Sequence, residues 1–395
     1  MLIYFVFRSF CTIFATDMTE QLIIGYDAKR IVRNATGLGS YSRTLVNDLA
    51  SLGTFSLRLY APDAGRDDLR CQIAPQPHVK FCYPKDVSLP FDKAIWRTRG
   101  IAKDLRRDGV RLFHGLSGEL PHGLRRRGIR SVVTIHDLIF LRHPEYYNWI
   151  DRQVYTWKFH HAVKAADHII AISECTRRDI IEFGNVDEQK ISVIYQSCAP
   201  HFSSESDFQK CEQIRLLYGL PKRFILQVGT IEARKNAMLS VRALHHLPKD
   251  LALVLVGRHT EYTNKIMAYA SEQGLSHRLF LFHDVPDDHL PCFYAEAEAF
   301  VYPSRYEGFG IPIIEAIRCG LPVVACTGSC LEEAGGPDCL YVSPDDAEAL
   351  ADAVVHTLHG AEGREQRIMN SQQYIRRFEG ADVASQVFSL YQSLL

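Results

Sequence analysis

The stretch that decides the fold is AFVYPSRYEGFGIPIIE, from Ala299 to Glu315. Its first five residues are apolar and predict a strand over 299–303. A Gly-rich loop follows, and Pro312 suits the first turn of a helix because its ring presets the backbone angle φ. A strand, a short loop and a helix in this order form the repeating unit of a parallel α/β sheet.

The same alternation of apolar runs and helical patterns extends in both directions from this stretch. Runs that are apolar throughout suit strands covered on both faces. The predicted strands of the first half are 22–28, 55–61, 78–83, 110–114, 131–136, 168–173 and 191–196, and those of the second half are 224–229, 251–257, 279–283, 299–303, 321–326 and 339–343. We therefore expect an α/β protein with two doubly wound, Rossmann-like parallel-sheet domains that face each other across a cleft.

The 395 residues suffice for two domains at about 100–200 residues each. The polar segment 202–210 interrupts the alternation, so we predict domains over 18–200 and 201–363, with a C-terminal helix over 364–395 that can return to the first domain. Residues 1–17 are apolar and aromatic but too short for a comfortable membrane span. Two interpretations of them stay open: a start-site artefact or loose extension, and a membrane-touching anchor.

Composition excludes collagen, a disordered tail protein and a disulfide mini-scaffold, because 47% of the residues are hydrophobic and 23% are charged. The 11 cysteines form no Cys-x-x-Cys pair, so no zinc-ribbon spacing is present, and a reducing compartment such as the cytoplasm fits best.

Charge is distributed unevenly along the chain. Residues 1–200 carry 28 Lys and Arg against 21 Asp and Glu, whereas the rest carries 17 against 25. Much of the excess lies between Arg97 and Arg130, which predicts a peripheral contact with anionic lipid headgroups or a lipid-diphosphate acceptor. A solvated basic face is the alternative. Nucleic acid is not expected, because interleaved aromatics and a recognition module are lacking. The basic residues are Arg97, Arg99, Lys103, Arg106, Arg107, Arg111, Arg125, Arg126, Arg127 and Arg130.

Glu307 and Glu315 form the most specific pattern in the sequence. One lies in the Gly-rich loop and the other on the predicted first turn of the helix. Backbone N–H groups at a helix start face anions or hydroxyls, and here they belong to Phe309, Gly310 and Ile311. One carboxylate can accept the two vicinal hydroxyls of a ribose while the other orients a sugar.

Three weaker motifs also follow predicted strands. Arg234 and Lys235 come after the strand 224–229, and two cations before a helix can hold a diphosphate. His136, which Asp137 follows, ends the strand 131–136, where a neutral histidine can donate a hydrogen bond to a hydroxyl or a developing charge. The segment 37–39, Gly-Leu-Gly, lets the backbone approach a phosphate. The alternatives are that Arg234 and Lys235 are a solvated surface pair, that His136 is a hydrogen-bonded structural residue, and that segment 37–39 is a plain tight turn.

Five segments together resemble the retaining glycosyltransferases of family 4: TGLGSYSRTL, HDLIFLRHPEYYN, ADHIIAISECTRRDII, VGTIEARKN and EGFGIPIIEA. They occur in the order and spacing of that family, from about residue 22 to about residue 360. The resemblance implies the two-domain GT-B fold, with the first domain on the acceptor side. It also implies a nucleotide-sugar donor and neither a cofactor nor an obligatory metal.

The resemblance further implies roles for individual residues. Glu315 is expected to bind the ribose, Glu307 to contact the donor sugar near its O3, and the Phe309, Gly310 and Ile311 amides to contact sugar and diphosphate. Arg234 and Lys235 are expected to hold the diphosphate and stabilise the leaving group. His136 is expected to reach a hydroxyl of the transferred sugar, and Val285 to touch the base through its backbone. Gly37 and Gly39 are expected to approach the phosphate or the acceptor.

Donor and acceptor follow less directly from the sequence. The segment HDLIFLRHPEYYN resembles mannosyltransferases of polysaccharide assembly, which makes GDP-mannose the first expectation, while UDP-glucose, UDP-galactose and UDP-N-acetylglucosamine stay open. The expected acceptor is a glycan or lipid-linked sugar at the inner face of the cytoplasmic membrane. Competing functions are a nucleotide-sugar epimerase and a catalytically silent nucleotide-sugar binder. An NAD-dependent enzyme is disfavoured because the glycine fingerprint is incomplete.

Overall fold

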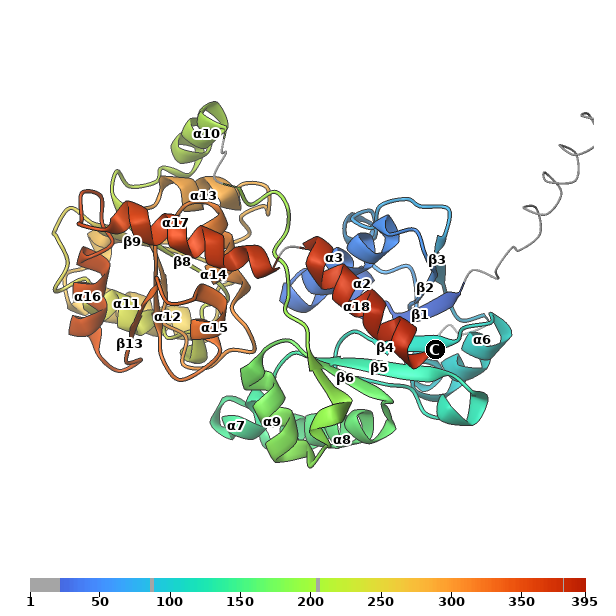
Figure 1. Cartoon of the computed structure of the whole chain (residues 1–395). Helices are drawn as coiled ribbons and strands as arrows, with labels where there is room; N and C mark the ends of the chain where they lie inside the picture. Colours follow the sequence, from blue (N-terminus) through green and yellow to red (C-terminus); the bar gives the residue numbers. More distant parts are fainter. Residues whose placement is uncertain (1–21, 86–88, 204–206, 379) are drawn as a thin grey trace, which may run out of the picture.

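The computed structural model describes residues 22–85, 89–203, 207–378 and 380–395, which form two α/β domains (Figure 1). In the first domain, seven parallel strands form a sheet in the order β3-β2-β1-β4-β5-β6-β7. The strands are β1 (Ile23–Asp27), β2 (Ser56–Tyr60), β3 (Val79–Cys82), β4 (Leu112–Gly115), β5 (Arg130–Ile135), β6 (His168–Ala171) and β7 (Ile191–Val193).

Helices cover both faces of this sheet, each over its own hydrophobic core. On one face lie α2 (Lys29–Arg33), α3 (Gly37–Ser51) and α18 (Gly380–Leu394). On the other lie the π-helix η1 (Trp96–Gly100), α6 (Ile101–Arg107), α8 (Trp149–Ala165) and α9 (Glu174–Gly184). The shorter helices are α4 (Asp67–Arg70), α5 (Pro90–Ile95) and α7 (Ile139–Arg142).

The second domain repeats this architecture with a six-stranded parallel sheet in the order β10-β9-β8-β11-β12-β13. The strands are β8 (Phe224–Val228), β9 (Ala252–Val256), β10 (Leu279–Phe282), β11 (Ala299–Tyr302), β12 (Val323–Cys326) and β13 (Leu340–Val342). One face is covered by α11 (Ala237–Ala243), α12 (Glu261–Glu272) and α16 (Ala347–Val355), and the other by α10 (Phe208–Tyr218), α13 (Leu290–Glu296), α14 (Ile311–Arg318), α15 (Leu331–Gly335) and α17 (Arg364–Ile375).

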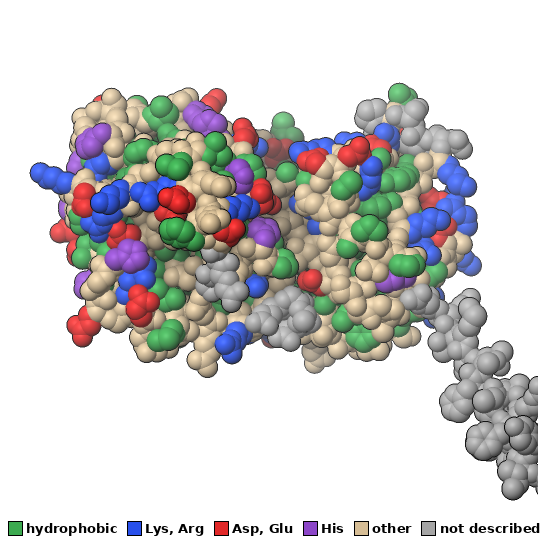
Figure 2. Space-filling view, turned by 90° about the horizontal axis from the view of Figure 1, so that it is seen from above, with side chains coloured by type: hydrophobic (Ala, Val, Ile, Leu, Met, Phe, Trp, Pro, Cys, Tyr) green, Lys and Arg blue, Asp and Glu red, His purple; other side chains and the backbone are tan. Residues whose placement is uncertain are grey.

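The predicted fold class is confirmed. Each of the thirteen segments predicted as strands overlaps one strand of the structure. In both sheets the strand order reverses, between β1 and β4 in the first and between β8 and β11 in the second. Ligands of open α/β sheets bind at the carboxyl ends of the strands beside such a reversal. Seen from above, the two domains form two adjoining lobes (Figure 2).

The C-terminal segment differs from the single helix predicted over 364–395. The structure has two helices there. The first, α17, stays on the second domain, where it packs against α14 and α15. The chain returns to the first domain only after Phe378, because that ring is buried in the core of the second domain. The second helix, α18, then packs against α3, where Tyr391 is fully buried.

Residues 1–17 lie outside the described residues, so both interpretations of them stay predictions. Within the part of the chain that the structure describes, no helix is long and apolar enough to cross a membrane.

Candidate active site

The strand-order reversal of the second sheet carries the residues that the sequence singles out. The chain leaves β8 through a loop and a 3-10 turn, Ala233–Lys235, which places Arg234 and Lys235 beside the loop after β11 that holds Glu307. Asn236 then adopts the left-handed conformation, with φ of 54°, and α11 begins. The two cations therefore precede the helix in a tight turn of their own.

Glu307 forms ion pairs with both cations. One of its oxygens, Oε1, lies 2.9 Å from Arg234 Nη1 and 2.6 Å from Lys235 Nζ, and all three side chains are largely buried. Burial alone raises the pKa of Glu307, but the charges of Lys235 and Arg234 outweigh it and hold the pKa at about 2. Arg234, Lys235 and Glu307 together carry one net positive charge, which the Glu232 carboxylate offsets at 2.7 Å from Arg234.

Neighbouring groups fix the position of each cation. Lys235 Nζ donates a hydrogen bond to the Tyr302 hydroxyl at 2.5 Å. Arg234 donates to the Tyr306 carbonyl at 2.6 Å and to Glu232 Oε1 at 2.7 Å. Burial lowers the pKa of both cations, but the charge of Glu307 more than offsets this and raises it, so both stay protonated. Such fixed charges are suited to stabilise an anion that forms beside them.

Gly308 brings this loop against the first domain. A Cβ atom at Gly308 would lie 2.1 Å from the carbonyl oxygen of His136, so only glycine permits this approach. The Gly308 carbonyl accepts a hydrogen bond from the Ser173 hydroxyl at 2.7 Å. The loop of Glu307 therefore meets the carboxyl ends of β5 and β6 across the domain boundary.

His136 is held by two hydrogen bonds. Nε2 donates to the Leu116 carbonyl at 2.8 Å, and Nδ1 then accepts from Gln196 Nε2 at 2.9 Å. Its ring meets the ring of Tyr41 edge to face, 4.7 Å between centroids. Burial lowers the pKa of His136 to about 4, so the ring is neutral. Its expected contact with a sugar hydroxyl stays a prediction and requires one of these hydrogen bonds to open.

Glu315 lies on the second turn of α14, not on the first turn as predicted, because that helix starts at Ile311. Its Oε2 accepts a hydrogen bond from the Tyr294 hydroxyl at 2.9 Å, and burial raises its pKa to about 7. It lines a cavity of about 260 Å³ between the domains, together with Gly37 from the start of α3 and Asp287 from the loop before α13. The structure thus brings Glu315 and Gly37 together.

The other predicted residues occupy different positions around these groups. Phe309 is buried and stacks on Tyr195 at 5.4 Å. Gly310 has a φ of 136°, which other residues avoid, and Ile311 begins α14 and lines the same cavity as Glu315. Val285 is half-buried in the loop between β10 and α13. Gly39 packs tightly inside the first domain, because a Cβ there would lie 1.8 Å from the Asn34 carbonyl oxygen.

A second cavity, of about 240 Å³, was not predicted from the sequence. It lies in the first domain beside His136 and Asp137, and its further lining residues include Arg30, Glu119, Tyr147, Tyr155 and Lys158.

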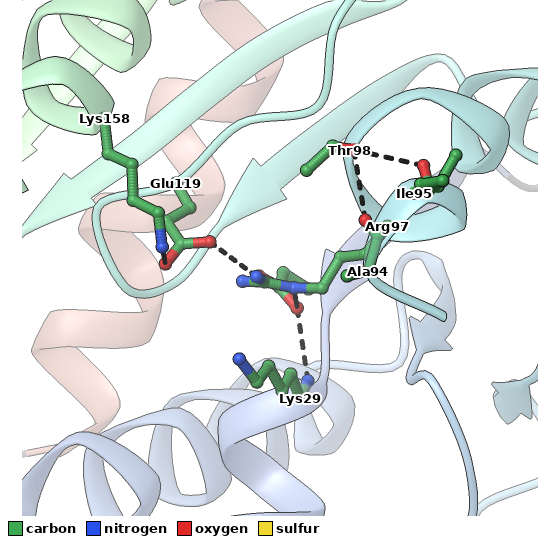
Figure 3. Close-up of polar contacts among 8 residues, drawn as sticks. Lys29, Ala94, Ile95, Arg97, Thr98, Glu119 and Lys158 are labelled. Atoms are coloured by element: carbon green, nitrogen blue, oxygen red, sulfur yellow. Dashed lines mark hydrogen bonds and ion pairs between the residues drawn. The ribbon is translucent and has the colours of Figure 1, made fainter. Parts of the chain in front are cut away.

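The structure corrects the interpretation of Arg97 as part of an exposed basic cluster. The Arg97 guanidinium is largely buried and bridges Asp27 and Glu119, and Lys158 donates to Glu119 at 3.1 Å (Figure 3). Burial alone raises the pKa of Glu119, but the charges of Arg97 and Lys158 lower it to about 2. Asp27 lies 70 positions from Arg97 in sequence, so only the reversal between β1 and β4 reveals the pairing.

Among the described residues, no group of three or more His, Cys, Asp or Glu side chains is arranged to hold a metal ion.

Comparisons with known proteins agree with this architecture. The chain is 29% identical to the O-antigen chain mannosyltransferase B of Escherichia coli over 289 residues, 72% of this chain and 74% of that protein. It is 29% identical to the O-antigen chain mannosyltransferase RfbU of Salmonella typhimurium over 225 residues, 57% and 60% of the two chains. The solved structure of a sucrose-phosphate synthase from Thermosynechococcus elongatus superposes with a TM-score of 0.77 at 22% identity, over 94% of this chain and 99% of that chain.

Two family models divide the chain at the linker. The model described as Glycosyltransferase Family 4 matches residues 35–197, and the model described as Glycosyl transferases group 1 matches residues 215–374. The matched regions correspond to the two α/β domains. The chain therefore belongs to the family 4 glycosyltransferases with the GT-B architecture.

Proposed function

We propose that the enzyme transfers mannose from GDP-mannose, with retention at the anomeric carbon, to a glycan or lipid-linked sugar during the assembly of a surface polysaccharide. The observation that carries this proposal is the buried cluster of Arg234, Lys235 and Glu307 at the strand-order reversal, beside Gly308, which approaches His136 of the first domain. The two mannosyltransferases named above support the choice of sugar and of product, because each is an O-antigen chain enzyme.

The cluster suits the charge changes of this reaction. When the bond between the anomeric carbon and the diphosphate breaks, negative charge grows on the diphosphate and positive charge on the sugar. Arg234 and Lys235 stabilise the first, and the Glu307 carboxylate orients the sugar. We propose that this chemistry needs no obligatory metal, and that an oxygen of the departing phosphate takes the proton of the attacking hydroxyl, which arrives on the same face.

The cavity of the first domain suits the acceptor. It combines the Glu119 carboxylate, the Lys158 ammonium and the rings of Tyr147 and Tyr155, and it adjoins Asp137. Hydroxyls hydrogen-bond to the charged groups, and the apolar face of a sugar ring packs on the aromatic ones. The acceptor hydroxyl thus enters beside His136, opposite the donor loop.

The test measures first binding and then transfer. Melting temperatures are recorded with GDP, GDP-mannose, UDP and UDP-sugars, with Mg²⁺ and with a chelator, because a ligand of the native state raises the melting temperature. We expect a shift with GDP and GDP-mannose in both conditions. A shift with UDP compounds alone would overturn the donor, and a shift that vanishes with the chelator would overturn metal independence.

Transfer is then followed with mannose-terminated glycans, free and lipid-linked, and the anomeric configuration of the product is determined by NMR. An inverted product would contradict retention. Conversion of the donor sugar without any acceptor would indicate an epimerase instead.

A further inference from the structure

The helix α8 is apolar on two opposite sides. Its inner side packs Phe159, Ala162 and Val163 into the core shared with α6. On its outer side Ile150 and Trp157 are 67% and 59% exposed, and Trp149, the first residue of the helix, is 70% exposed. A helix that covers a sheet is ordinarily polar on its outer side. The fold therefore does not account for the exposure of these three apolar side chains, which include two of the three tryptophans of the chain.

The exposed apolar side chains form a stripe. At about 100° per residue, Ile150, Val154 and Trp157 fall within an arc of about 60° on the side of α8 away from Phe159. Val154, like Phe91 and Ile95 of α5, is exposed.

His122 connects the two helices. Its ring lies 6.3 Å from the ring of Trp157, and its backbone N–H donates to the carbonyl of Thr98, in the π-helix η1 that follows α5, at 2.8 Å. We refer to the exposed side chains Phe91, Ile95, Trp149, Ile150, Val154 and Trp157 as the α5–α8 face.

The chain around this face is strongly basic. Residues 92–164 carry 15 Lys and Arg against 7 Asp and Glu, a net charge of +8, which exceeds the net charge of +7 over residues 1–200. Arg97 is buried, but Lys103, Arg106, Arg107, Arg125 and Arg126 are exposed. Lys103, Arg106 and Arg107 lie on α6, which packs into the same hydrophobic core as α8, and Arg125 and Arg126 lie in a 3-10 turn. Tryptophan with Lys and Arg is the combination enriched at membrane interfaces.

A second apolar surface, on α10, lacks the net positive charge that surrounds the α5–α8 face. Phe208, Leu216 and Leu217 are as exposed as the tryptophans of α8. However, α10 packs against α13, and residues 207–218 and 284–298 together carry seven Asp and Glu against two cations, Lys210 and Arg215. An anionic surface would be repelled there. Charge therefore distinguishes two surfaces that are equally apolar.

We propose that the α5–α8 face docks on a bilayer that contains anionic lipids. The rings of Trp149 and Trp157 enter the headgroup region, and the basic side chains of α6 and of residues 125–126 lie against the lipid phosphates. Because α8 also lines the cavity of the first domain through Tyr155 and Lys158, docking holds that cavity at the membrane surface. The assignment of this cavity to a lipid-linked acceptor rests on the proposed function, but docking itself does not.

The experiment measures flotation of the full chain with lipid vesicles, without donor or acceptor, so that its outcome is independent of the proposed function. Vesicles of phosphatidylcholine are compared with vesicles that also contain phosphatidylglycerol. The variant Trp149→Gln/Ile150→Gln/Trp157→Gln tests the face, and Leu216→Gln/Leu217→Gln on α10 is the matched control. All replaced side chains are exposed, and melting temperatures, with and without GDP-mannose and UDP-sugars, verify that each variant is folded.

We expect the wild type and the α10 variant to float with the anionic vesicles, and the α8 variant to float at least about tenfold less. Raising the salt from about 0.01 M to about 1 M, which shortens the Debye length from roughly 30 Å to 3 Å, should release the wild type. Equal flotation of the α8 variant, or none of the wild type, would overturn the proposal. So would a wild-type dimer in light scattering that the α8 substitutions dissociate, because the face would then join two copies of the chain.

Discussion

Lys235 carries a buried charge that is paired with Glu307 and Tyr302. Its replacement by Ala leaves Arg234 to neutralise Glu307, so we expect a folded protein. The rate of transfer should fall roughly 10²–10³-fold, as it does when a fixed donor to a developing charge is removed. Steady-state kinetics measure this loss. Lys222→Ala, at an exposed lysine of the same domain, is the control, and equal rates for both variants would place the leaving group elsewhere.

Glu315 makes the stability of the protein depend on pH. Burial raises its folded pKa to about 7, from an ordinary value of 4.5, so the folded state binds this proton more tightly than the unfolded state. Its stabilising contribution is complete below the ordinary pKa and is lost as the pH rises through the folded pKa, by up to about 1.4 kcal/mol per pH unit.

The variant Glu315→Gln lacks this proton equilibrium and retains a similar shape. The urea midpoint of the wild type should therefore be lower above pH 7 than below pH 4.5. The midpoint of the variant should change less between these two pH ranges. If the urea midpoints of the two proteins changed equally with pH, the pKa of Glu315 would not be raised in the folded state. The variant should also bind GDP-mannose more weakly, because an amide accepts fewer hydrogen bonds from ribose hydroxyls than a carboxylate does.

At the scale of elements, two glycines at the start of α3 differ in whether the fold requires glycine: Gly39 is required and Gly37 is not. A Cβ at Gly39 would lie 1.8 Å from the Asn34 carbonyl oxygen, whereas one at Gly37 would meet no atom within 4 Å. Gly39→Ala should therefore destabilise the first domain by about 1–3 kcal/mol, the usual cost of overpacking. Gly37→Ala should keep the wild-type melting temperature. Since Gly37 lines the cavity of Glu315, a weaker response to GDP-mannose in that variant would support its predicted role.

The helix α18 fastens the C-terminus to the first domain through Tyr391. Its hydroxyl and His114 Nδ1 form a fully buried hydrogen bond of 2.6 Å. Tyr391→Phe leaves the histidine without this partner and should cost about 1–3 kcal/mol of unfolding free energy. Gln386→Ala, at an exposed position of α18, is the control for urea unfolding. Equal midpoints for both would mean that α18 adds little stability.

The sequence predicts the elements well because strands covered on both faces are apolar throughout, as β9 shows with Ala-Leu-Val-Leu-Val. It predicts Arg234 and Glu307 in one site because their loops follow strands that the reversal makes neighbours. The sequence does not predict contacts between residues that lie far apart in the chain. The sequence pattern predicts Arg97 as a surface residue, because it does not show that the fold places Asp27 beside Arg97. In the same way, nothing in the sequence indicates that Gln196 forms a hydrogen bond with His136.

At the scale of the molecule, side chains of both domains interlock around α9. The Glu333 carboxylate of the second domain accepts hydrogen bonds from the amides of Glu174 and Cys175, at 2.7 and 2.9 Å. Negative charge at a helix N-terminus is stabilising. The Tyr306 hydroxyl donates to Asp179 of the same helix at 2.7 Å. These contacts hold α15 and the loop after β11 against the first domain.

Gly308→Ala tests whether this closed arrangement is the active one. The φ of Gly308 is not in the left-handed region, and the three atoms nearest to a Cβ there belong to His136 and Asp137 of the other domain. Alanine is therefore compatible with the second domain alone and incompatible with closure. We expect the variant to retain the melting-temperature shift with GDP-mannose, to show a larger radius of gyration in X-ray scattering, and to lose roughly 10²-fold in kcat, the loss that a misplacement of about 1 Å can cause. A variant that transfers at the wild-type rate with an unchanged radius would mean that the loop yields locally and that closure does not depend on this contact.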